Sequence, residues 1–266
     1  MFDPAHHDLH VVPYDIDTAR YAPGDAAAVR GRLGLPARGL GIALGSVSLE
    51  EERKGFLQAK AALEGMASEL RRSGSAGPPP FIVTYGEGKL AVDGLESHHL
   101  GQQDEAGVID VLRACDTFLM MAREDNLPNT VMEAIACGVP VVGTAVGGIP
   151  EMVEHGSQGW LVAKDDSRAA AAALARLARD PAELAAAAAS SRERAERLYP
   201  RPLQGSRYAA IFSGLLGQPT AVATAAAGGR TGRSDLTPGA VRLLRRRMAA
   251  RKQLRAIRRL LPVRWL

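Results

Sequence analysis

The chain has 266 residues, 46% of them hydrophobic and 23% charged, which are the proportions of an ordinary globular protein. Its two cysteines, Cys115 and Cys137, are too few for a disulfide framework or a zinc site. No stretch approaches the roughly 18 apolar residues of a membrane-spanning helix, and the N-terminus lacks the apolar run of a signal peptide. We therefore expect a cytoplasmic protein.

The first 38 residues show little hydrophobic periodicity and contain several prolines. Proline interrupts regular helices and strands. We expect residues 1–38 to form an extended lead-in, or hinge segment, with a short helix near Asp25–Leu33.

From residue 39 onward, apolar runs that suit buried strands alternate with segments of helical spacing. Strands joined by helices pair in parallel through crossovers, so residues 39–216 are predicted to form a doubly wound α/β sheet of the Rossmann type. Alanine-rich helices close this domain. The expected strands are 40–47, 81–85, 97–101, 116–121 and 139–144, and the expected helices are 54–72, 105–114, 129–137, 167–179, 181–197 and 201–215.

The C-terminal part differs from the rest in composition and charge. Residues 217–239 are rich in Ala, Gly and Thr and are predicted to be a flexible linker, and residues 240–266 form a basic tail. Residues 230–266 alone carry a net charge of +11 against +4 for the whole chain, so the body is at −7. Residues 251–261 form a basic amphipathic segment, which would suit the anionic surface on the inner side of a membrane. Packing of the tail against the acidic body is an equally open alternative, and nucleic acid is not expected because interleaved aromatics are lacking.

The loop after the predicted strand 116–121 is the strongest candidate for a binding site. Ligands of doubly wound sheets bind beyond the carboxyl ends of the strands, where helix N-termini present free N–H groups. Pro128 favours a helix start there. The amides of Asn129, Thr130 and Val131 would then suit a diphosphate.

Two acids flank this helix start. Glu133 lies about one turn inside the helix, where a carboxylate could accept hydrogen bonds from the two hydroxyls of a ribose. Asp125 lies eight residues earlier, where it could contact a sugar attached to the diphosphate. The alternative is that both acids only stabilise the helix N-terminus electrostatically. Spacing alone does not separate these interpretations.

The segment that runs from Asp125 through Glu133 to residues 136–142 (ACGVPVV) resembles a diagnostic segment of one large family. That family of glycosyltransferases includes the sucrose and glycogen synthases and mannosyltransferases. Its members carry two acids separated by seven residues and then a turn of the A-x-G-x-P-V-V type. Asp125 stands where the family has Glu. Further matches at residues 9–23, 30–36, 98–122 and 147–162 occur in the same order, so the resemblance covers about residues 9–215.

The resemblance implies the donor-binding, C-terminal half of a retaining GT-B enzyme of glycan biosynthesis in bacteria, with a UDP- or GDP-linked sugar as donor and no required metal. It implies that Lys54 meets the donor phosphates and that Gly101 lies where backbone groups read the base. The family often has an arginine six residues before this lysine, where Ser48 stands here, and we expect Arg53 to substitute.

The chain begins where the second domain of that family begins, so the acceptor half would have to come from elsewhere. It could be a fragment of a longer enzyme, a subunit that pairs with an acceptor-binding chain, or a donor-binding relic without activity. A sugar-nucleotide epimerase shares the architecture, and a non-catalytic binding module is a further alternative. A NAD-binding protein is disfavoured because no G-x-G-x-x-G follows the first strand.

Overall fold

The structure is a computed structural model that describes residue 10 and residues 12–75 and 77–216. The chain divides into two compact units, residues 1–211 and residues 212–266. The predicted linker 217–239 and the predicted tail 240–266 lie outside the described residues. Within the described ranges, no helix is long and apolar enough to cross a membrane.

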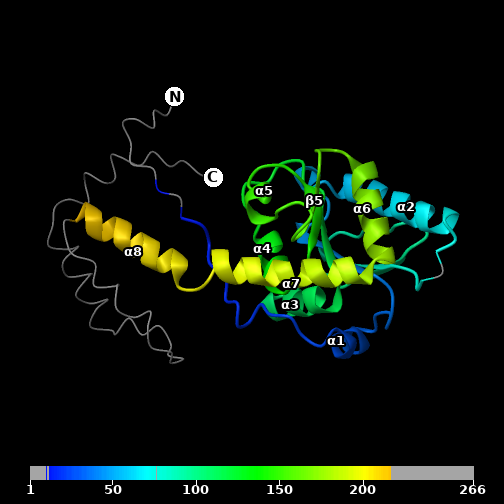
Figure 1. The fold of residues 1–266 in the computed structure, drawn as a ribbon, viewed down its shortest axis with the longest axis horizontal. Coiled ribbons are helices and arrows are strands. Elements are labelled where there is room, and N and C mark those ends of the chain that lie inside the picture. Colours follow the sequence, from blue (N-terminus) through cyan, green and yellow to red (C-terminus); the bar gives the residue numbers. More distant parts are fainter. Residues whose placement is uncertain (1–9, 11, 76, 217–266) are drawn as a thin grey trace. The chain divides into compact units, whose positions relative to one another are not determined.

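The first unit is built around one sheet of six parallel strands (Figure 1). The strand order is β3-β2-β1-β4-β5-β6, so the chain leaves the centre of the sheet first in one direction and then in the other. This order confirms the predicted doubly wound α/β fold. The strands are β1 (Gly41–Ser48), β2 (Phe81–Glu87), β3 (Glu96–His99), β4 (Thr117–Met120), β5 (Val141–Thr144) and β6 (Gly159–Val162).

Helices cover both faces of the sheet and create two apolar cores. One core lies between the sheet and α1, α3, α4 and α5, and the other between the sheet and α2 and α6. Parallel strands that are covered on both faces consist of nearly continuous apolar residues. β4 and β5 follow this rule and are buried along their whole length. The helices are α1 (Ala26–Leu33), α2 (Phe56–Arg72), α3 (Glu105–Ala114), α4 (Asn129–Ala136), α5 (Ile149–Met152), α6 (Ser167–Arg179), α7 (Pro181–Leu198) and α8 (Leu203–Leu215), with a 3-10 turn η2 (Glu52–Lys54).

The segment that precedes the sheet packs against the first of these cores. Arg192 of α7 donates to the carbonyl oxygens of Tyr21 and Ala136, at 2.6 Å each, and so joins this segment to the end of α4. Tyr21 itself is buried in the core. The lead-in therefore places an aromatic side chain beneath α4.

A buried arginine fastens α1 to the amino end of the sheet. The side chain of Arg30 is only 8% exposed, and its Nη2 atom lies 2.7 Å from Oδ2 of Asp116. Its Nε atom donates to the carbonyl oxygen of Ala114 at 2.8 Å, and its guanidinium lies 5.0 Å from the centre of the Phe81 ring. Because every polar group of this cluster has a partner, the arginine is tolerated inside the core.

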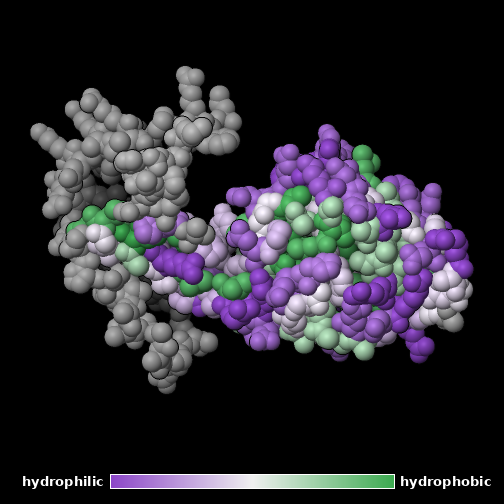
Figure 2. All heavy atoms as spheres, turned by 45° about the horizontal axis from the view of Figure 1, so that its top comes forward, coloured by the Kyte–Doolittle hydropathy of each residue, from purple (hydrophilic) through white to green (hydrophobic). Residues whose placement is uncertain are grey.

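The surface of the first unit is mostly hydrophilic, with smaller hydrophobic areas between the charged residues (Figure 2). Two of its large hydrophobic side chains are strongly exposed, Val47 by 82% and Leu57 by 75%. Both belong to segments at the carboxyl edge of the sheet, Val47 near the end of β1 and Leu57 in the first turn of α2.

Candidate functional site

The candidate site lies where the strand order reverses. β1 and β4 are neighbours in the centre of the sheet, and the connections that follow them lead to opposite sides. Such a point leaves a crevice outside the carboxyl ends of the two strands, where doubly wound sheets bind their ligands. The loop after β1 contains Lys54, and the loop after β4 contains Asp125.

The loop after β4 is fastened to the loop after β1. The carbonyl oxygen of Arg53 accepts hydrogen bonds from the amides of Arg123, at 2.8 Å, and Glu124, at 3.3 Å. Next to it, Gly55 has a φ of 69°, and a Cβ atom at this position would lie 1.7 Å from the carbonyl oxygen of Met121. Only glycine permits this close approach of the two backbones.

Two further glycines, Gly147 and Gly148, hold the same loop from the side of β5. The amide of Gly148 donates to the carbonyl oxygen of Asn126 at 2.6 Å. Gly147 has a φ of 53°, and a Cβ atom there would lie 1.6 Å from the carbonyl oxygen of Asp125. The backbone that carries Asp125 is therefore clamped between the loops that follow β1 and β5.

Lys54 and Asp125 form a largely buried ion pair between the loops that follow β1 and β4. Nζ of Lys54 lies 2.7 Å from Oδ2 of Asp125, and the two side chains are only 15% and 10% exposed. Arg53 adds a second cation, because its Nη1 atom lies 3.9 Å from the same oxygen, although its Nε atom is bonded to Glu51. The structure thus brings together three of the residues selected from the sequence.

The N-terminus of α4 opens next to Asp125. Its N-cap is Pro128, and no side chain caps the first turn. The amide of Val131 donates to the carbonyl oxygen of Pro128 at 3.1 Å. The first amides of a helix have no acceptor within the helix, so Asn129 and Thr130 are the residues whose N–H groups are best placed to meet an anion.

Glu133 lies one turn into α4 and is half-buried. Burial raises the pKa of its carboxyl above the ordinary value, and the negative charge of Glu105 raises it further. A hydrogen bond from the Tyr21 hydroxyl acts in the opposite direction, because it stabilises the charged form. Tyr21 was not selected from the sequence. Its only signal is its place in the lead-in stretch 9–23, which is one of the segments that resemble the family.

Gly101 follows β3, at the same edge of the sheet but two strands away from β1. Its φ is 68°, and its carbonyl oxygen accepts a hydrogen bond from the amide of Gly86 at 2.8 Å. The turn after β3 is therefore tied to the end of β2. Space is open around Gly101, because an added Cβ atom would meet no atom within 4 Å.

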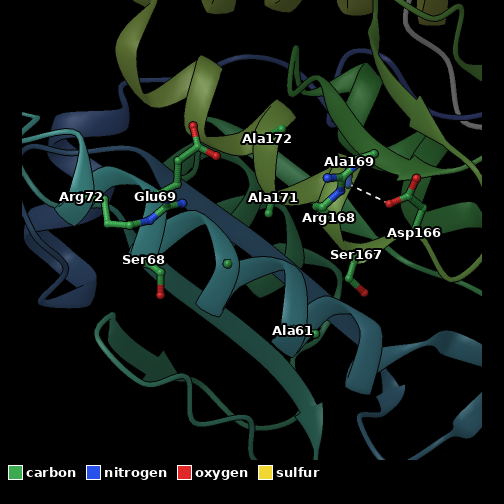
Figure 3. Close-up of a pocket in the computed structure, with 11 residues that line it drawn as sticks. Ala61, Ser68, Glu69, Arg72, Asp166, Ser167, Arg168, Ala169, Ala171 and Ala172 are labelled. Carbon is green, nitrogen blue, oxygen red and sulfur yellow. Dashed lines mark hydrogen bonds between the residues drawn. The ribbon is translucent and has the colours of Figure 1, made fainter.

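A separate groove of about 630 Å³ runs between α2 and α6 (Figure 3). Small side chains such as Ala61 and Ala171 form its floor, and Glu69, Arg72 and Arg168 stand along it. None of the residues at the crevice between β1 and β4 lines it. Among the described residues, no group of three or more His, Cys, Asp or Glu side chains could hold a metal ion.

Comparison with known proteins identifies the central part of the chain. Residues 80–180, which include Gly101, Asp125 and Glu133, match the family model described as "Glycosyl transferases group 1". The chain carries a glycosyl transferase group 1 domain. This result confirms the predicted family.

Relatives of the group 1 domain agree with this assignment. The chain is 31% identical over 208 residues to the D-inositol 3-phosphate glycosyltransferase of Saccharomonospora viridis, an alignment that covers 74% of this chain and 48% of that protein. The chain thus spans about half the length of this relative.

Solved structures share the fold of the group 1 domain. Anabaena HepE, determined in complex with UDP-glucose, matches with a TM-score of 0.63 at 20% identity, over 77% of this chain and 57% of that one. The C-terminal domain of the group 1 protein LpcC from Francisella tularensis matches with a TM-score of 0.57 at 19% identity, over 70% of this chain and 99% of that one. The second match agrees with a C-terminal type of domain.

Proposed function

We propose that the group 1 domain binds a UDP- or GDP-linked sugar and that the complete enzyme transfers this sugar, with retention of configuration, to an acceptor. The observation that carries the proposal is the pairing of Lys54 with Asp125 at the switch point of the sheet, beside the uncapped start of α4. This arrangement offers a cation and free amides for a diphosphate, and a carboxylate for a sugar next to it.

Each part of the donor has a partner in this proposal. The diphosphate is bound by Lys54, with Arg53 beside it, and by the first-turn amides of α4. A buried ammonium group neutralises the charge that develops on the leaving diphosphate without reorganising at the moment of reaction. The proposal assigns this task to protein groups and includes no metal ion, so we expect binding to be insensitive to EDTA.

The sugar and the nucleoside occupy positions on either side of the diphosphate. Asp125 contacts hydroxyls of the transferred sugar, and Glu133 accepts hydrogen bonds from the ribose. The base lies toward Gly101, where backbone groups of the turn after β3 are open. HepE, whose structure holds UDP-glucose, shares this fold and supports a nucleotide sugar as the ligand.

The acceptor and the remaining catalytic groups are proposed to come from an acceptor-binding domain or subunit. The crevice lies at one edge of a single sheet, and a transfer reaction needs the acceptor hydroxyl held against the sugar at the same place. Two hydrophobic side chains at this edge, Val47 and Leu57, are exposed, as expected of a surface that another part covers.

Calorimetric titration of the 266-residue chain with UDP and with GDP tests the proposal. Micromolar to millimolar binding of at least one nucleotide is expected, and no binding of either at millimolar concentration would overturn it. Lys54→Ala should weaken that binding about tenfold, because a charged hydrogen bond to the diphosphate is lost. Lys60→Ala is the matched control: Lys60 lies six residues later, in α2, and pairs with Glu64, so its removal should leave the affinity unchanged.

Incubation with a nucleotide sugar separates the remaining alternatives. An epimerase would isomerise the donor without an acceptor, whereas a transferase would leave the sugar unchanged until an acceptor and its domain are supplied. A non-catalytic module would bind the donor and neither transfer nor hydrolyse it in any combination.

A further inference from the structure

We propose that Asp125 also determines specificity: it makes the site favour a nucleotide that carries a sugar over the free nucleoside diphosphate. The inference rests on the proposed function, because it assumes that the crevice between β1 and β4 is the donor site. It concerns how the carboxylate of Asp125 exchanges Lys54 for the hydroxyls of a sugar, rather than the sugar contact itself.

Asp125 is the ion-pair partner of the cation that a diphosphate would use. Its Oδ2 atom lies 2.7 Å from Nζ of Lys54 and 3.9 Å from Nη1 of Arg53. The side chain of Asp125 is only 10% exposed, so water compensates little for a lost partner. A diphosphate that recruits Lys54 must therefore weaken an ion pair that is already formed.

The backbone that carries Asp125 is held in place by its neighbours. Its backbone carbonyl is pressed against Gly147, and its neighbours on either side are bonded to Arg53 and Gly148. A diphosphate at Lys54 consequently lies beside a fixed, largely buried carboxylate. Two anions in a partly desolvated site repel each other strongly.

A sugar nucleotide removes this penalty, whereas a free diphosphate does not. The hydroxyls of the sugar donate hydrogen bonds to the carboxylate and replace the donor that Lys54 provided. The free diphosphate brings only acceptors and leaves Asp125 short of partners. Discrimination by an unpaired buried charge in the wrong complex is a recognised source of specificity. In a transfer reaction it favours binding of the donor and release of the product.

The test compares two nucleotide pairs, UDP with UDP-glucose and GDP with GDP-mannose, on the 266-residue chain by calorimetry. We expect the wild-type chain to bind the sugar nucleotide of its preferred pair more tightly than the diphosphate. In Asp125→Asn, the diphosphate should bind about fivefold more tightly, because the repulsion is gone. The preference for the sugar nucleotide should fall or disappear.

Two further variants make the result specific. Glu124→Gln removes the same charge from the neighbouring residue, which is exposed, and should change neither affinity. Asp125→Glu keeps the charge and should keep the preference. Circular dichroism verifies that each variant is folded.

An unchanged or weaker affinity of Asp125→Asn for the diphosphate would overturn the inference, as would an equal gain in Glu124→Gln. Either result would leave the proposed function intact, provided that the wild-type chain binds nucleotide. Failure of the wild-type chain to bind any of the four nucleotides would instead overturn the proposed function, and this inference with it.

Discussion

Replacing Glu133 by Gln should weaken nucleotide binding through the ribose alone. The substitution keeps the size of the side chain and one carbonyl acceptor but removes the negative charge. Glu133 is half-buried on α4, and the Tyr21 hydroxyl already bonds to its carboxylate. The carboxylate therefore has limited free acceptor capacity for a ribose, in a place where solvent screening is reduced.

The size of the effect follows from this geometry. A hydrogen bond to a charged group contributes about 1.5–3 kcal/mol and a neutral one about 0.5–1.5 kcal/mol. With part of the carboxylate already engaged by Tyr21, we take the difference between the lower ends of the two ranges, about 1 kcal/mol, which corresponds to roughly a fivefold weaker affinity.

The assay compares ribose and deoxyribose nucleotides. The wild-type chain should bind UDP (or GDP, whichever is preferred) more tightly than its 2′-deoxy analogue, and Glu133→Gln should bind the two about equally. If the variant keeps the full preference for the ribose form, Glu133 does not contact the 2′-hydroxyl and its assigned role is wrong.

The same substitution should stabilise the folded chain at neutral pH. The pKa of Glu133 is raised in the folded state, first by burial and then by Glu105. Its contribution to stability is therefore fully present below the ordinary pKa of about 4.5 and is lost as the pH rises through the raised value. Glu133→Gln should melt at a higher temperature than wild type at pH 7 and at nearly the same temperature at pH 4.

Nucleotide affinity of the wild type should fall as the pH is lowered through the raised pKa of Glu133, because the charged form of its carboxyl accepts the hydrogen bonds of the ribose.

Two further predictions, each with a control variant, concern the stability of the folded chain. Gly55→Ala should lower the free energy of unfolding in urea by about 3 kcal/mol or more, because it combines backbone strain with a steric clash. Gly34 also has a positive φ, of 66°, but has open space around it, so Gly34→Ala should cost only about 1–2 kcal/mol. Equal losses in the two variants would contradict the close approach at position 55. Arg30→Met should cost about 3–5 kcal/mol because it leaves Asp116 without its buried partner. Arg32→Met, which removes an arginine whose side chain is 56% exposed, should cost less than about 1 kcal/mol in the same urea unfolding experiment, and a similar loss in both variants would show that burial of the pair is unimportant.

Most of the fold follows from patterns that are local in the sequence. Continuous apolar runs between helical segments predict a parallel sheet, and the alanine-rich segment 167–179 forms a helix with the predicted ends. The helix α5 was not predicted, because its four residues are too few to show a hydrophobic period. The sequence also contains no local signal for the 3-10 turn that carries Lys54.

The site was predictable in its composition but not in its connections. The family resemblance implied that Lys54 meets the phosphates, and the place of Asp125 before the helix suggested a contact with the sugar; the two side chains prove to be bonded to each other. That contact depends on glycines at positions 55 and 147, which from sequence alone are simply turn residues. The contact of Tyr21 with Glu133 joins segments that lie more than a hundred residues apart, and no periodicity reports such a distance.

The strand order that brings the loops after β1 and β4 together also determines at which stage of folding the candidate site forms. Lys54 and Asp125 are 71 residues apart and meet only after β1 has paired with β4. Closing a loop of this length costs entropy before any contact compensates for it, so such contacts form slowly. A refolding chain should therefore recover its helices before it recovers the crevice. The proposed nucleotide site therefore requires the assembled sheet, and no single segment of the chain could form it alone.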